Sequence, residues 1–476
     1  MVALTSPDFK RRAARALADA NLQKALRRGG SGFHSKRAQA TAALPEFEAL
    51  RDIGRDIKNH TLANLDHYLE AFEAKVVANG GRVHWCRDAA EARATVLKIC
   101  READARTVTK GKSMISEEIG LNEHLAANGI TPVETDLGEY ILQLVNEPPS
   151  HIIAPAFHLN REDWESRFRA AHKDLPADRV FHDRRDIMAE ARQTLRERFV
   201  QADVGITGAN FLIAETGTSV IVTNEGNGDL TQTLPRVHIA LASIEKVVPT
   251  LEDCSTLLRL LARSATGQDL SVYTTFSTGP RRAADADGPE AYHVVLIDNG
   301  RSNMLGTDFH EMLRCIRCAA CINHCPVYNA AGGHAYGWVY PGPMGSVLTP
   351  ALVGLEKSAN LPNASSLCGR CESVCPVKIP LPKMLRNWRE REFERHLTPS
   401  TARRGLGIWA WFARRPALYR AATRLAMGTL ALLGRGTGRF RRLPLAGAWT
   451  ASRDLPAPEP GGTFMARYAA AQRGRR

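Results

Sequence analysis

Ten cysteines occur in this 476-residue chain, and seven of them fall in two closely spaced motifs. The first motif has the spacing C-x2-C-x2-C-x3-C-P, and the second repeats its last three cysteines and the following proline. The motif cysteines are Cys315, Cys318, Cys321, Cys325, Cys368, Cys371 and Cys375. This spacing is typical of bacterial ferredoxins, in which three thiolates bind one [4Fe–4S] cluster and the fourth binds a second cluster. The motifs therefore predict two iron–sulfur clusters and one-electron chemistry.

Alignment of the two motifs on their Cys-Pro pairs predicts how the cysteines divide between the clusters. Cluster 1 is expected to be held by Cys315, Cys318, Cys321 and Cys375. Cluster 2 is then held by Cys325, Cys368 and Cys371. Ser365 stands where a fourth cysteine would align. The fourth iron of cluster 2 either takes another ligand, such as Ser365, water, a nearby side chain or a partner's group, or is absent, which leaves [3Fe–4S].

Structural zinc is the competing interpretation of the cysteines. Zinc takes four ligands in a tetrahedron, usually from two separated cysteine pairs, and a run of four followed by a run of three fits that pattern poorly. His324 and His334 lie near the motifs, but a histidine in such a loop is more often a surface residue than a ligand. The isolated Cys86, Cys100 and Cys254 are expected to be buried thiols.

The elements that must position these cysteines divide the chain into four segments. Residues 1–65 are amphipathic and predicted to be helical. Residues 66–300 alternate short β-rich runs with amphipathic helices, which predicts an α/β domain around a sheet buried on both faces. Residues 305–385 hold the cysteine motifs and a Gly- and Pro-rich stretch that we expect to be loop. Residues 386–476 form an arginine-rich C-terminal region that begins with a helix.

Within the α/β segment the strands are expected from runs rich in β-branched and aromatic residues. A long run at 202–226 contains two strands around "AETGTS" that are expected to pair as a hairpin. The other expected strands are 82–85, 106–111, 131–136, 151–157, 237–243, 271–277 and 292–298.

Two stretches of this segment are candidate ligand sites. In "TKGKSMISEEIG", Lys110 and Lys112 stand at a strand end, and Ser113 is placed to cap a helix that contains Glu118, an arrangement suited to a carboxylate or phosphate. A capped surface helix with solvated lysines explains the same residues. The second stretch groups polar residues that are explained equally well as hairpin turns: Glu215, Thr216, Asn224 and Glu225. A G-x-G-x-x-G dinucleotide fingerprint is absent.

The net charge of +13 is located entirely in the C-terminal region. Residues 401–476 contain fifteen arginines, no lysine, and only Asp454 and Glu459 as acids, and the remaining 400 residues are neutral overall. A nucleic-acid-binding fold would instead show a basic face, so no nucleic-acid partner is expected. The region fits a docking segment or a peripheral membrane contact, because its arginines interrupt every apolar run before about 20 residues. The first 30 residues lack the apolar stretch of a secretory signal, which together with clustered cysteines predicts a cytoplasmic protein.

The chain resembles the lactate utilization protein B family, the iron–sulfur member of a three-component bacterial L-lactate oxidation system. The resemblance runs from about residue 60 to the end and is carried by the two cysteine motifs and by "TKGKSMISEEIGLN", "ETDLGEYILQL", "GITGANFLIAETGTSVIVTNEGNGDL" and "YPGPMGSVLTP". It implies an α/β LUD domain similar to the sugar-isomerase and CoA-transferase group, followed by an α-helical dicluster ferredoxin-like domain and the basic C-terminal region. It also implies two partners, a cysteine-rich iron–sulfur subunit and a second LUD-domain subunit, and three-cysteine coordination of cluster 2 as a family trait.

Two functions of different classes follow from these observations. In the first, the chain is the electron-transfer subunit of a complex that oxidises L-lactate to pyruvate, with two one-electron clusters serving a two-electron oxidation. The open iron of cluster 2 could alternatively bind lactate as a Lewis acid. In the second, the chain is a redox-responsive assembly or regulatory module whose clusters only stabilise a partner-binding surface. Reduction of the clusters by lactate in the reconstituted complex separates the two functions.

Overall fold

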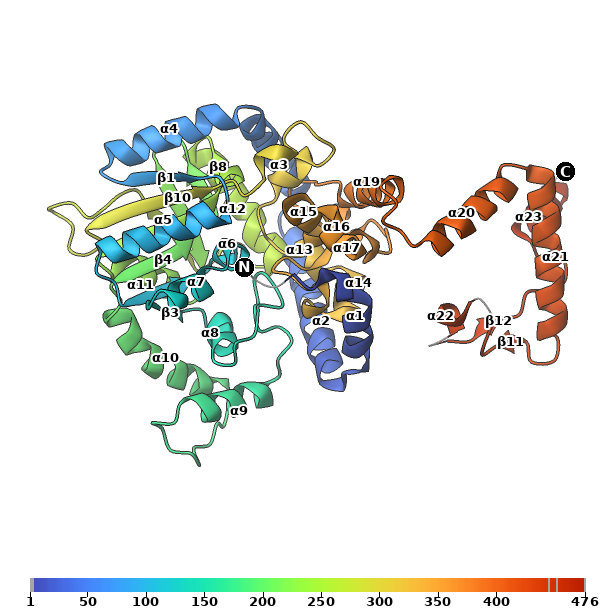
Figure 1. Ribbon diagram of the computed structural model, residues 1–476, viewed down its shortest axis with the longest axis horizontal. Coiled ribbons are helices and arrows are strands. Elements are labelled where there is room, and N and C mark those ends of the chain that lie inside the picture. The colour runs from blue at the N-terminus through green and yellow to red at the C-terminus, as the bar shows by residue number, and fades with distance from the viewer. Residues whose placement is uncertain (1–3, 444–445, 451–452, 475–476) are drawn as a thin grey trace. The chain divides into compact units, whose positions relative to one another are not determined.

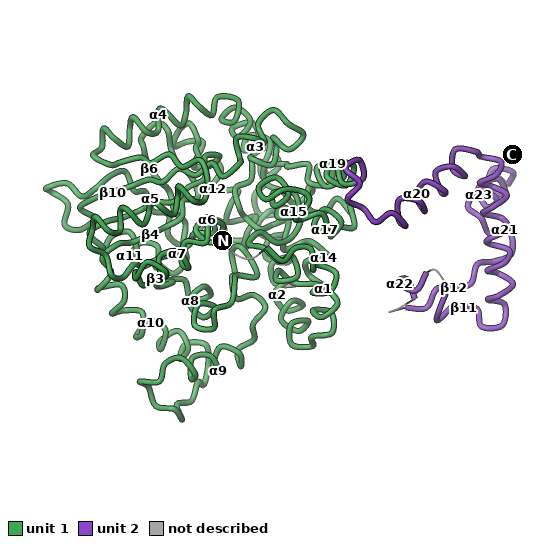
Figure 2. The backbone as a smooth tube through the Cα atoms, viewed as in Figure 1, with its two compact units in different colours: residues 1–392 green, residues 393–476 purple. Residues whose placement is uncertain are grey.

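The computed structural model describes residues 4–443, 446–450 and 453–474 of the chain. These residues form two compact units, 1–392 and 393–476, which Figure 2 shows in different colours. The first contains the α/β domain, the cysteine motifs and the N-terminal helices, and the second contains most of the arginine-rich region.

A six-stranded sheet forms the centre of the α/β domain (Figure 1). All of its strands are parallel, and its order is β1-β10-β7-β4-β2-β3. The strands are β1 (Arg82–Cys86), β10 (Ala291–Ile297), β7 (Val237–Ser243), β4 (Val204–Gly208), β2 (Thr107–Gly111) and β3 (Thr131–Glu134). From β2 the chain continues outward to β3, whereas from β4 it continues in the other direction to β7. The strand order therefore reverses between β2 and β4, and in open α/β sheets ligands bind beyond the carboxyl ends of the strands at such a reversal.

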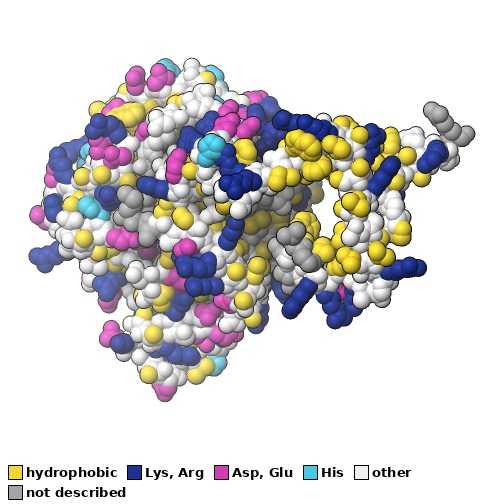
Figure 3. All heavy atoms as spheres, turned by 45° about the vertical axis from the view of Figure 1, so that its right-hand side comes forward, with side chains coloured by type: hydrophobic (Ala, Val, Ile, Leu, Met, Phe, Trp, Pro, Cys, Tyr) yellow, Lys and Arg dark blue, Asp and Glu magenta, His cyan; other side chains and the backbone are white. Residues whose placement is uncertain are grey.

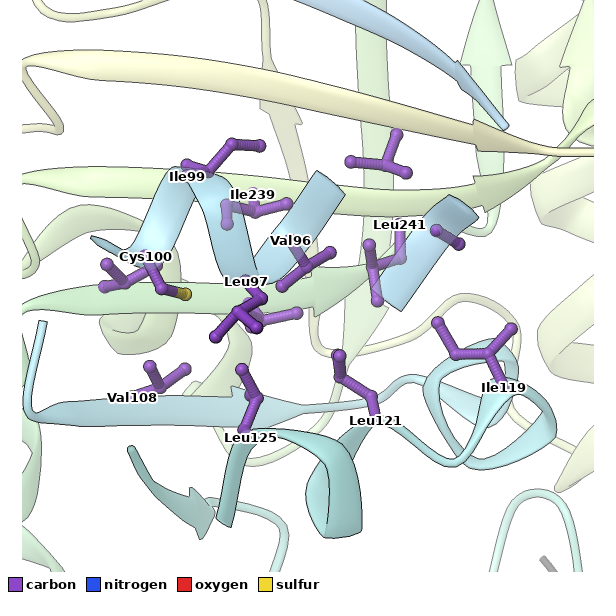
Figure 4. Packing of buried hydrophobic residues seen from close by; sticks show 14 of the residues in the cluster. Val96, Leu97, Ile99, Cys100, Val108, Ile119, Leu121, Leu125, Ile239 and Leu241 are labelled. Atoms are coloured by element: carbon purple, nitrogen blue, oxygen red, sulfur yellow. The ribbon is translucent and has the colours of Figure 1, made fainter. Parts of the chain in front are cut away.

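Helices cover both faces of this sheet, because alternate residues of each central strand point to opposite faces. On one face, Val295 and Ile297 of β10 join a cluster formed with α5 (Ala89–Glu102), α6 (Met114–Ile119) and α7 (Leu121–Ala127). Figure 4 shows part of this cluster, with residues of the three helices next to Ile239 and Leu241 of β7. On the other face, Val294 and Leu296 pack with Leu69 and Phe72 of α4 (Leu65–Ala78). The prediction of an α/β domain with a doubly covered sheet is confirmed.

A second, four-stranded sheet has the order β8-β5-β6-β9, and its strands lie in the chain between β4 and β7 and between β7 and β10 of the first sheet. Its strands are β8 (Val247–Val248), β5 (Phe211–Ile213), β6 (Thr218–Thr223) and β9 (Tyr273–Ser277). β5 and β6 pair antiparallel, which confirms the hairpin expected around "AETGTS". The domain is completed by α8 (Leu137–Gln143), α9 (Arg161–Ala171), α10 (Arg184–Val200), α11 (Asn227–Thr233), η2 (Ile244–Lys246) and α12 (Leu251–Ala265).

The strand predicted over residues 151–157 is wrong. This apolar segment forms bends and turns, and the backbone N–H groups of Ile153 and Ala154 each donate to Nδ1 of buried His151 at 3.2 Å. The other ring nitrogen of His151 pairs with the side chain of Asn323 at 2.9 Å. His151 thus accepts hydrogen bonds from backbone N–H groups that would otherwise need acceptors on a neighbouring strand.

The N-terminal helices and the cysteine region pack together within the first unit. Phe9 of α1 (Phe9–Ala18) and Leu26 of α2 (Ala20–Ala42) share a core with Tyr328 and Tyr336 from the cysteine region. α3 (Phe47–Ala63) packs on α12 and η4 (His310–Arg314). The short helices of this region are α13 (Ala320–Asn323), α14 (Pro326–Ala331), η5 (His334–Tyr336), α16 (Leu355–Ser358), α17 (Asn360–Asn363) and α18 (Arg370–Ser373).

The loop expected between the two cysteine motifs is only partly a loop. Residues Gly342–Val353 form the buried helix α15, with Pro343 in its first turn, where proline is tolerated because no partner exists for its missing N–H. α19 (Leu381–Glu394) follows the second motif and confirms the helix expected there.

The second unit contains helices with many exposed apolar side chains. Its elements are α20 (Ser400–Ala413), α21 (Pro416–Gly434), β11 (Arg439–Phe440), α22 (Gly447–Thr450), β12 (Leu455–Pro456) and α23 (Phe464–Arg473). Trp409, Trp411, Leu425 and Phe464 are all exposed, and Figure 3 shows hydrophobic side chains interspersed with arginines on this unit. Among the described residues, the chain forms no helix that is both long and apolar enough to cross a bilayer.

Candidate functional site

The structure brings four of the seven motif cysteines around one small apolar cavity. Cys315 follows η4, Cys318 precedes α13, Cys321 lies in its first turn, and Cys375 follows α18. The rest of the lining is mostly apolar and includes Met312, Ile316, Met344, Val377, Ile379 and Leu381. The loop between Cys315 and Cys321 turns tightly, and two of its residues adopt positive φ angles. The first three cysteines of the first motif and Cys375 of the second motif thus line the same cavity.

The chemistry of this donor set fits an iron–sulfur cluster. The backbone N–H of Ile379 donates to Sγ of Cys375 at 3.4 Å, a bond that remains available when the sulfur binds iron. Burial raises the pKa of the Cys375 thiol to about 11. A thiolate in this apolar space therefore needs a compensating cation, which bound iron provides. We call these four cysteines the four-cysteine site.

The remaining motif cysteines, Cys325, Cys368 and Cys371, form what we call the three-cysteine site. Cys325 caps α14 and Cys371 lies in α18, and both are buried, whereas Cys368 is exposed. Burial, followed by the charges of Cys325 and Cys368, raises the pKa of Cys371 to about 12, so the three thiols are close enough to interact electrostatically. Three thiols are enough to hold three irons of a cubane.

Ser365, which aligns with the missing fourth cysteine, is held by its own loop. Its Oγ accepts a hydrogen bond from the backbone N–H of Leu367 at 3.1 Å, and its carbonyl accepts one from Arg389 at 2.7 Å. Leu367 has a positive φ of 54°, which marks a tight local turn. This loop leads directly into exposed Cys368, so the three-cysteine site borders the protein surface.

A second cavity of about 210 Å³ lies beyond the carboxyl ends of the parallel strands. Its lining includes residues that follow β2, β4 and β7, where the strand order reverses. Ile152 and Arg317 line both this cavity and the four-cysteine cavity, so a single layer of side chains separates the two spaces. We call the larger space the sheet-edge cavity.

Arg317 is fixed between the two cavities by a buried charge network. Its guanidinium lies over the ring of Tyr340, 4.7 Å from the ring centre, and donates to Glu245 at 3.2 Å. Glu245 also pairs with Arg301 at 3.1 Å, and Arg301 pairs with Glu118 at 2.6 Å. The side chains of Arg301 and Glu118 are completely buried.

The carboxyl groups of this network keep their charge because of its arginines. Burial acts to raise the pKa of Glu245, but Arg301 and Arg317 together lower it to about 2. Burial acts in the same direction on Glu118, and Arg301 again outweighs it and holds the pKa below its usual value. The network therefore connects the α/β domain to the cysteine region through charged groups that are balanced inside the protein.

The seven candidate residues predicted in the α/β domain do not form one site. Lys112, Asn224 and Glu225 line the sheet-edge cavity. Lys110 is buried and pairs with Glu117 at 2.6 Å and Glu134 at 2.7 Å, and Glu118 belongs to the network above. Glu215 and Thr216 lie in the turn between β5 and β6, where Thr216 bonds Thr218. The structure confirms Ser113 as the N-cap of α6, and Cys86, Cys100 and Cys254 are buried as expected.

Sequence reasoning missed several residues that line the sheet-edge cavity, namely Glu139, Lys246, Arg317 and Tyr340. One signal was present for Lys246, because "IEK" places two charged residues directly after the apolar strand β7. The other three come from separate segments and have no local pattern in common.

The fold and the donor sets define a LUD-domain iron–sulfur protein. Residues 69–297 match the LUD domain family and residues 311–379 match the 4Fe-4S dicluster domain family. The chain belongs to the lactate utilization protein B family. It is 43% identical over 467 residues to lactate utilization protein B of Shouchella clausii, with 96% of each chain covered. It is 44% identical over 446 residues to that of Geobacillus thermodenitrificans, covering 92% of this chain and 93% of the relative.

Proposed function

We propose that this protein is the electron-transfer component of a multi-subunit complex that oxidises L-lactate to pyruvate. Membership of the family and the 4Fe-4S domain support an iron–sulfur role in lactate utilization. The observation that carries the finer proposal is the placement of the cysteines. The four-cysteine site adjoins the sheet-edge cavity through Ile152 and Arg317, and the three-cysteine site reaches the surface at Cys368.

The four-cysteine site would hold one [4Fe–4S] cluster and the three-cysteine site a second cluster. When bound, such clusters supply one-electron transfer at potentials set by hydrogen bonds to sulfur and by exposure to solvent. The chain's own contribution is to keep Cys315, Cys318, Cys321 and Cys375 in an apolar interior. It also leaves Cys368 where a partner's redox group can approach. The fourth ligand of the second cluster is then water, a partner's group or the hydroxyl of Ser365, whose Oγ also accepts the backbone N–H of Leu367.

Low-temperature EPR of the anaerobically purified protein, with iron and sulfide counted, tests this assignment. We expect two reduced cubane signals after dithionite, and reduction by L-lactate when the partner subunits are added. An oxidised [3Fe–4S] signal would show that the three-cysteine site holds only three irons. If the clusters form but lactate reduces neither one with any combination of partners, the alternative of a regulatory module with structural clusters would replace electron transfer. Zinc without paramagnetic iron would overturn both.

The partners that we propose are a cysteine-rich iron–sulfur subunit and a second LUD-domain subunit, in the cytoplasm, where thiols stay reduced. The second unit is suited to docking, since it combines exposed Trp409, Trp411 and Leu425 with arginines. Pelleting with anionic vesicles at low salt tests a lipid contact. Sedimentation of the full chain with vesicles containing anionic lipid, but not with neutral vesicles, would support a peripheral membrane contact, and a chain that stays in the supernatant would leave partner docking as its role.

A further inference from the structure

Two buried ionisable groups that line the sheet-edge cavity lack a partner among the residues that the structure describes. Lys246 and Glu139 are each 8% exposed. Oε2 of Glu139 is enclosed and makes no hydrogen bond, and across the described part of the chain the Lys246 ammonium forms no ion pair. Burying such groups without partners costs free energy, so each is expected to bind something that the protein itself does not supply.

The other charged groups of the cavity are already paired. Lys112 binds the carboxylates of Asp136 and Glu225, the latter at 3.0 Å, and Arg317 binds Glu245. The ammonium of Lys246 is the one cationic group lining the cavity, among the described residues, that lacks an acidic neighbour within ion-pair distance. Lys246 is thus the cation that remains available to pair with the carboxylate of a bound ligand.

The volume of the cavity limits the ligand further. At about 210 Å³, it is smaller than the roughly 300 Å³ at which pockets for drug-sized ligands begin. The enclosed space therefore matches the size of a small organic acid better than that of a whole nucleotide or coenzyme.

Glu139 adds a second recognition element of different chemistry. Burial, followed by the charges of Glu134 and Asp136, raises its pKa well above the usual value. The carboxyl group therefore keeps its proton to a higher pH than a free carboxyl group does, and in this form it can both donate and accept a hydrogen bond. Such a group suits an uncharged oxygen on the ligand, either a hydroxyl or a carbonyl.

We propose that the sheet-edge cavity binds a small 2-hydroxy or 2-oxo monocarboxylate, with the carboxylate at Lys246 and the 2-oxygen at Glu139. The class of ligand follows from the cavity, and its identification as L-lactate or pyruvate rests on the proposed function. Lys246 and Glu139 are binding residues in this assignment. Arg317 positions the wall that the cavity shares with the four-cysteine site.

Anaerobic isothermal titration calorimetry on the cluster-loaded full chain tests the proposal, with L-lactate, pyruvate and inorganic phosphate as separate titrants. Lys246→Met removes the charge at similar size and is expected to weaken lactate and pyruvate binding by about 10- to 100-fold, as the loss of a hydrogen bond to a charged group does. Glu139→Gln keeps the shape and is expected to weaken both acids by several-fold. Lys173→Met, at an exposed lysine, serves as the matched control and should bind both acids like the original protein.

Iron and sulfide contents, measured on each variant, show whether it is folded and loaded. Three outcomes would overturn the proposal: binding of neither acid, equal binding by Lys246→Met, or phosphate binding more tightly than either acid. A complex that oxidises lactate although this chain binds no acid would overturn the cavity proposal and leave electron transfer intact. Acid binding that depends on Lys246, in a chain whose clusters lactate never reduces, would support the cavity and overturn electron transfer.

Discussion

The two cysteine sites differ in how far the protein encloses them. The four-cysteine site has a complete thiol set in an apolar interior, next to the sheet-edge cavity. The three-cysteine site has one thiol fewer, and Cys368 is exposed to solvent. Two motifs with the same final spacing are therefore built into different surroundings, and the difference comes from what packs around them. In the proposed function, the closed site lies next to the substrate cavity and the open site is where a partner exchanges electrons.

The side chains around each site repeat this contrast. Near the four-cysteine site, Arg51 donates twice to the carbonyl of Cys375, at 3.0 and 2.8 Å, and Arg317 is held by Glu245. Near the three-cysteine site, backbone turns provide the support, with Ser365 bonded to Leu367 and Arg389. We therefore expect substitutions in the interior network to have large effects on stability, and substitutions around the exposed site to act mainly on its cluster.

The largest effect is expected from Cys375→Ala. If the thiols are shared between motifs as the cavity suggests, the loss of this second-motif cysteine removes the cluster of the first motif, about half of the iron. The EPR signal of the three-cysteine site should persist. Cys254→Ala, at a buried cysteine outside the motifs, is the control and should retain full iron. Loss of the three-cysteine signal instead would mean that each motif binds its own cluster.

The interior network gives the next effect. Arg301→Met leaves the buried carboxylates of Glu118 and Glu245 without their shared cation and is expected to lower the free energy of unfolding by about 3–5 kcal/mol. Arg389→Met removes only bonds to the carbonyls of Pro362 and Ser365 and should cost about 1 kcal/mol. Anaerobic urea unfolding followed by circular dichroism measures both. If both substitutions lowered the free energy of unfolding equally, the expected difference between the interior network and the loop around Ser365 would be wrong.

Features encoded by local spacing could be predicted from the sequence. The cysteine motifs are such a feature, and so are the alternating strands of the central sheet, because a period of two residues places Val294 and Val295 on opposite faces. The segment 151–157 shows where local pattern fails. Its apolar, β-branched residues resemble a strand, yet His151 satisfies the nearby backbone donors and turns the chain.

The sheet-edge cavity could not be predicted as a whole because its residues share no local pattern. Glu139 comes from α8, Lys246 from η2 and Arg317 from the first cysteine motif, and only the tertiary fold brings them around one space. The part of the lining that could be predicted lies at strand ends and turns, which mark this edge of the sheet. It consists of Lys112, Asn224 and Glu225.

The two predicted lysines of "TKGKS" have different surroundings, which the sequence did not distinguish. Lys110 lies within β2, where Glu117 and Glu134 neutralise it. Lys112 follows the end of β2 and has a positive φ of 57°, so the alternation of the strand no longer sets the direction of its side chain. Only Lys112 therefore reaches the cavity.

The affinity of the sheet-edge cavity for a carboxylate ligand is expected to change tenfold per pH unit above pH 8. Burial, followed by Arg317, lowers the pKa of Lys246 to about 8, while Glu245 and Cys315 act to raise it and Lys58 to lower it. The ammonium form that attracts a carboxylate thus predominates below pH 8 and is lost above it. The affinity for pyruvate should be constant from about pH 6 to 7 and fall by about tenfold per unit above pH 8. Calorimetry at each pH measures it, and Lys246→Met should show no such fall.

The smallest effect is expected from Ser365→Cys, which offers the three-cysteine site a fourth thiol. The hydroxyl of Ser365 bonds the N–H of Leu367, and a thiol accepts that bond only weakly, so the introduced thiol should be freer to turn toward the cluster. Iron release to a chelator in mild oxidant should then slow by a few-fold at the three-cysteine site. Release from the four-cysteine site should not change. Ser400→Cys, at an exposed position outside the motifs, is the control. If both variants release iron at the original rate, the loop around Ser365 is too rigid to supply a ligand, and the open position belongs to water or to a partner.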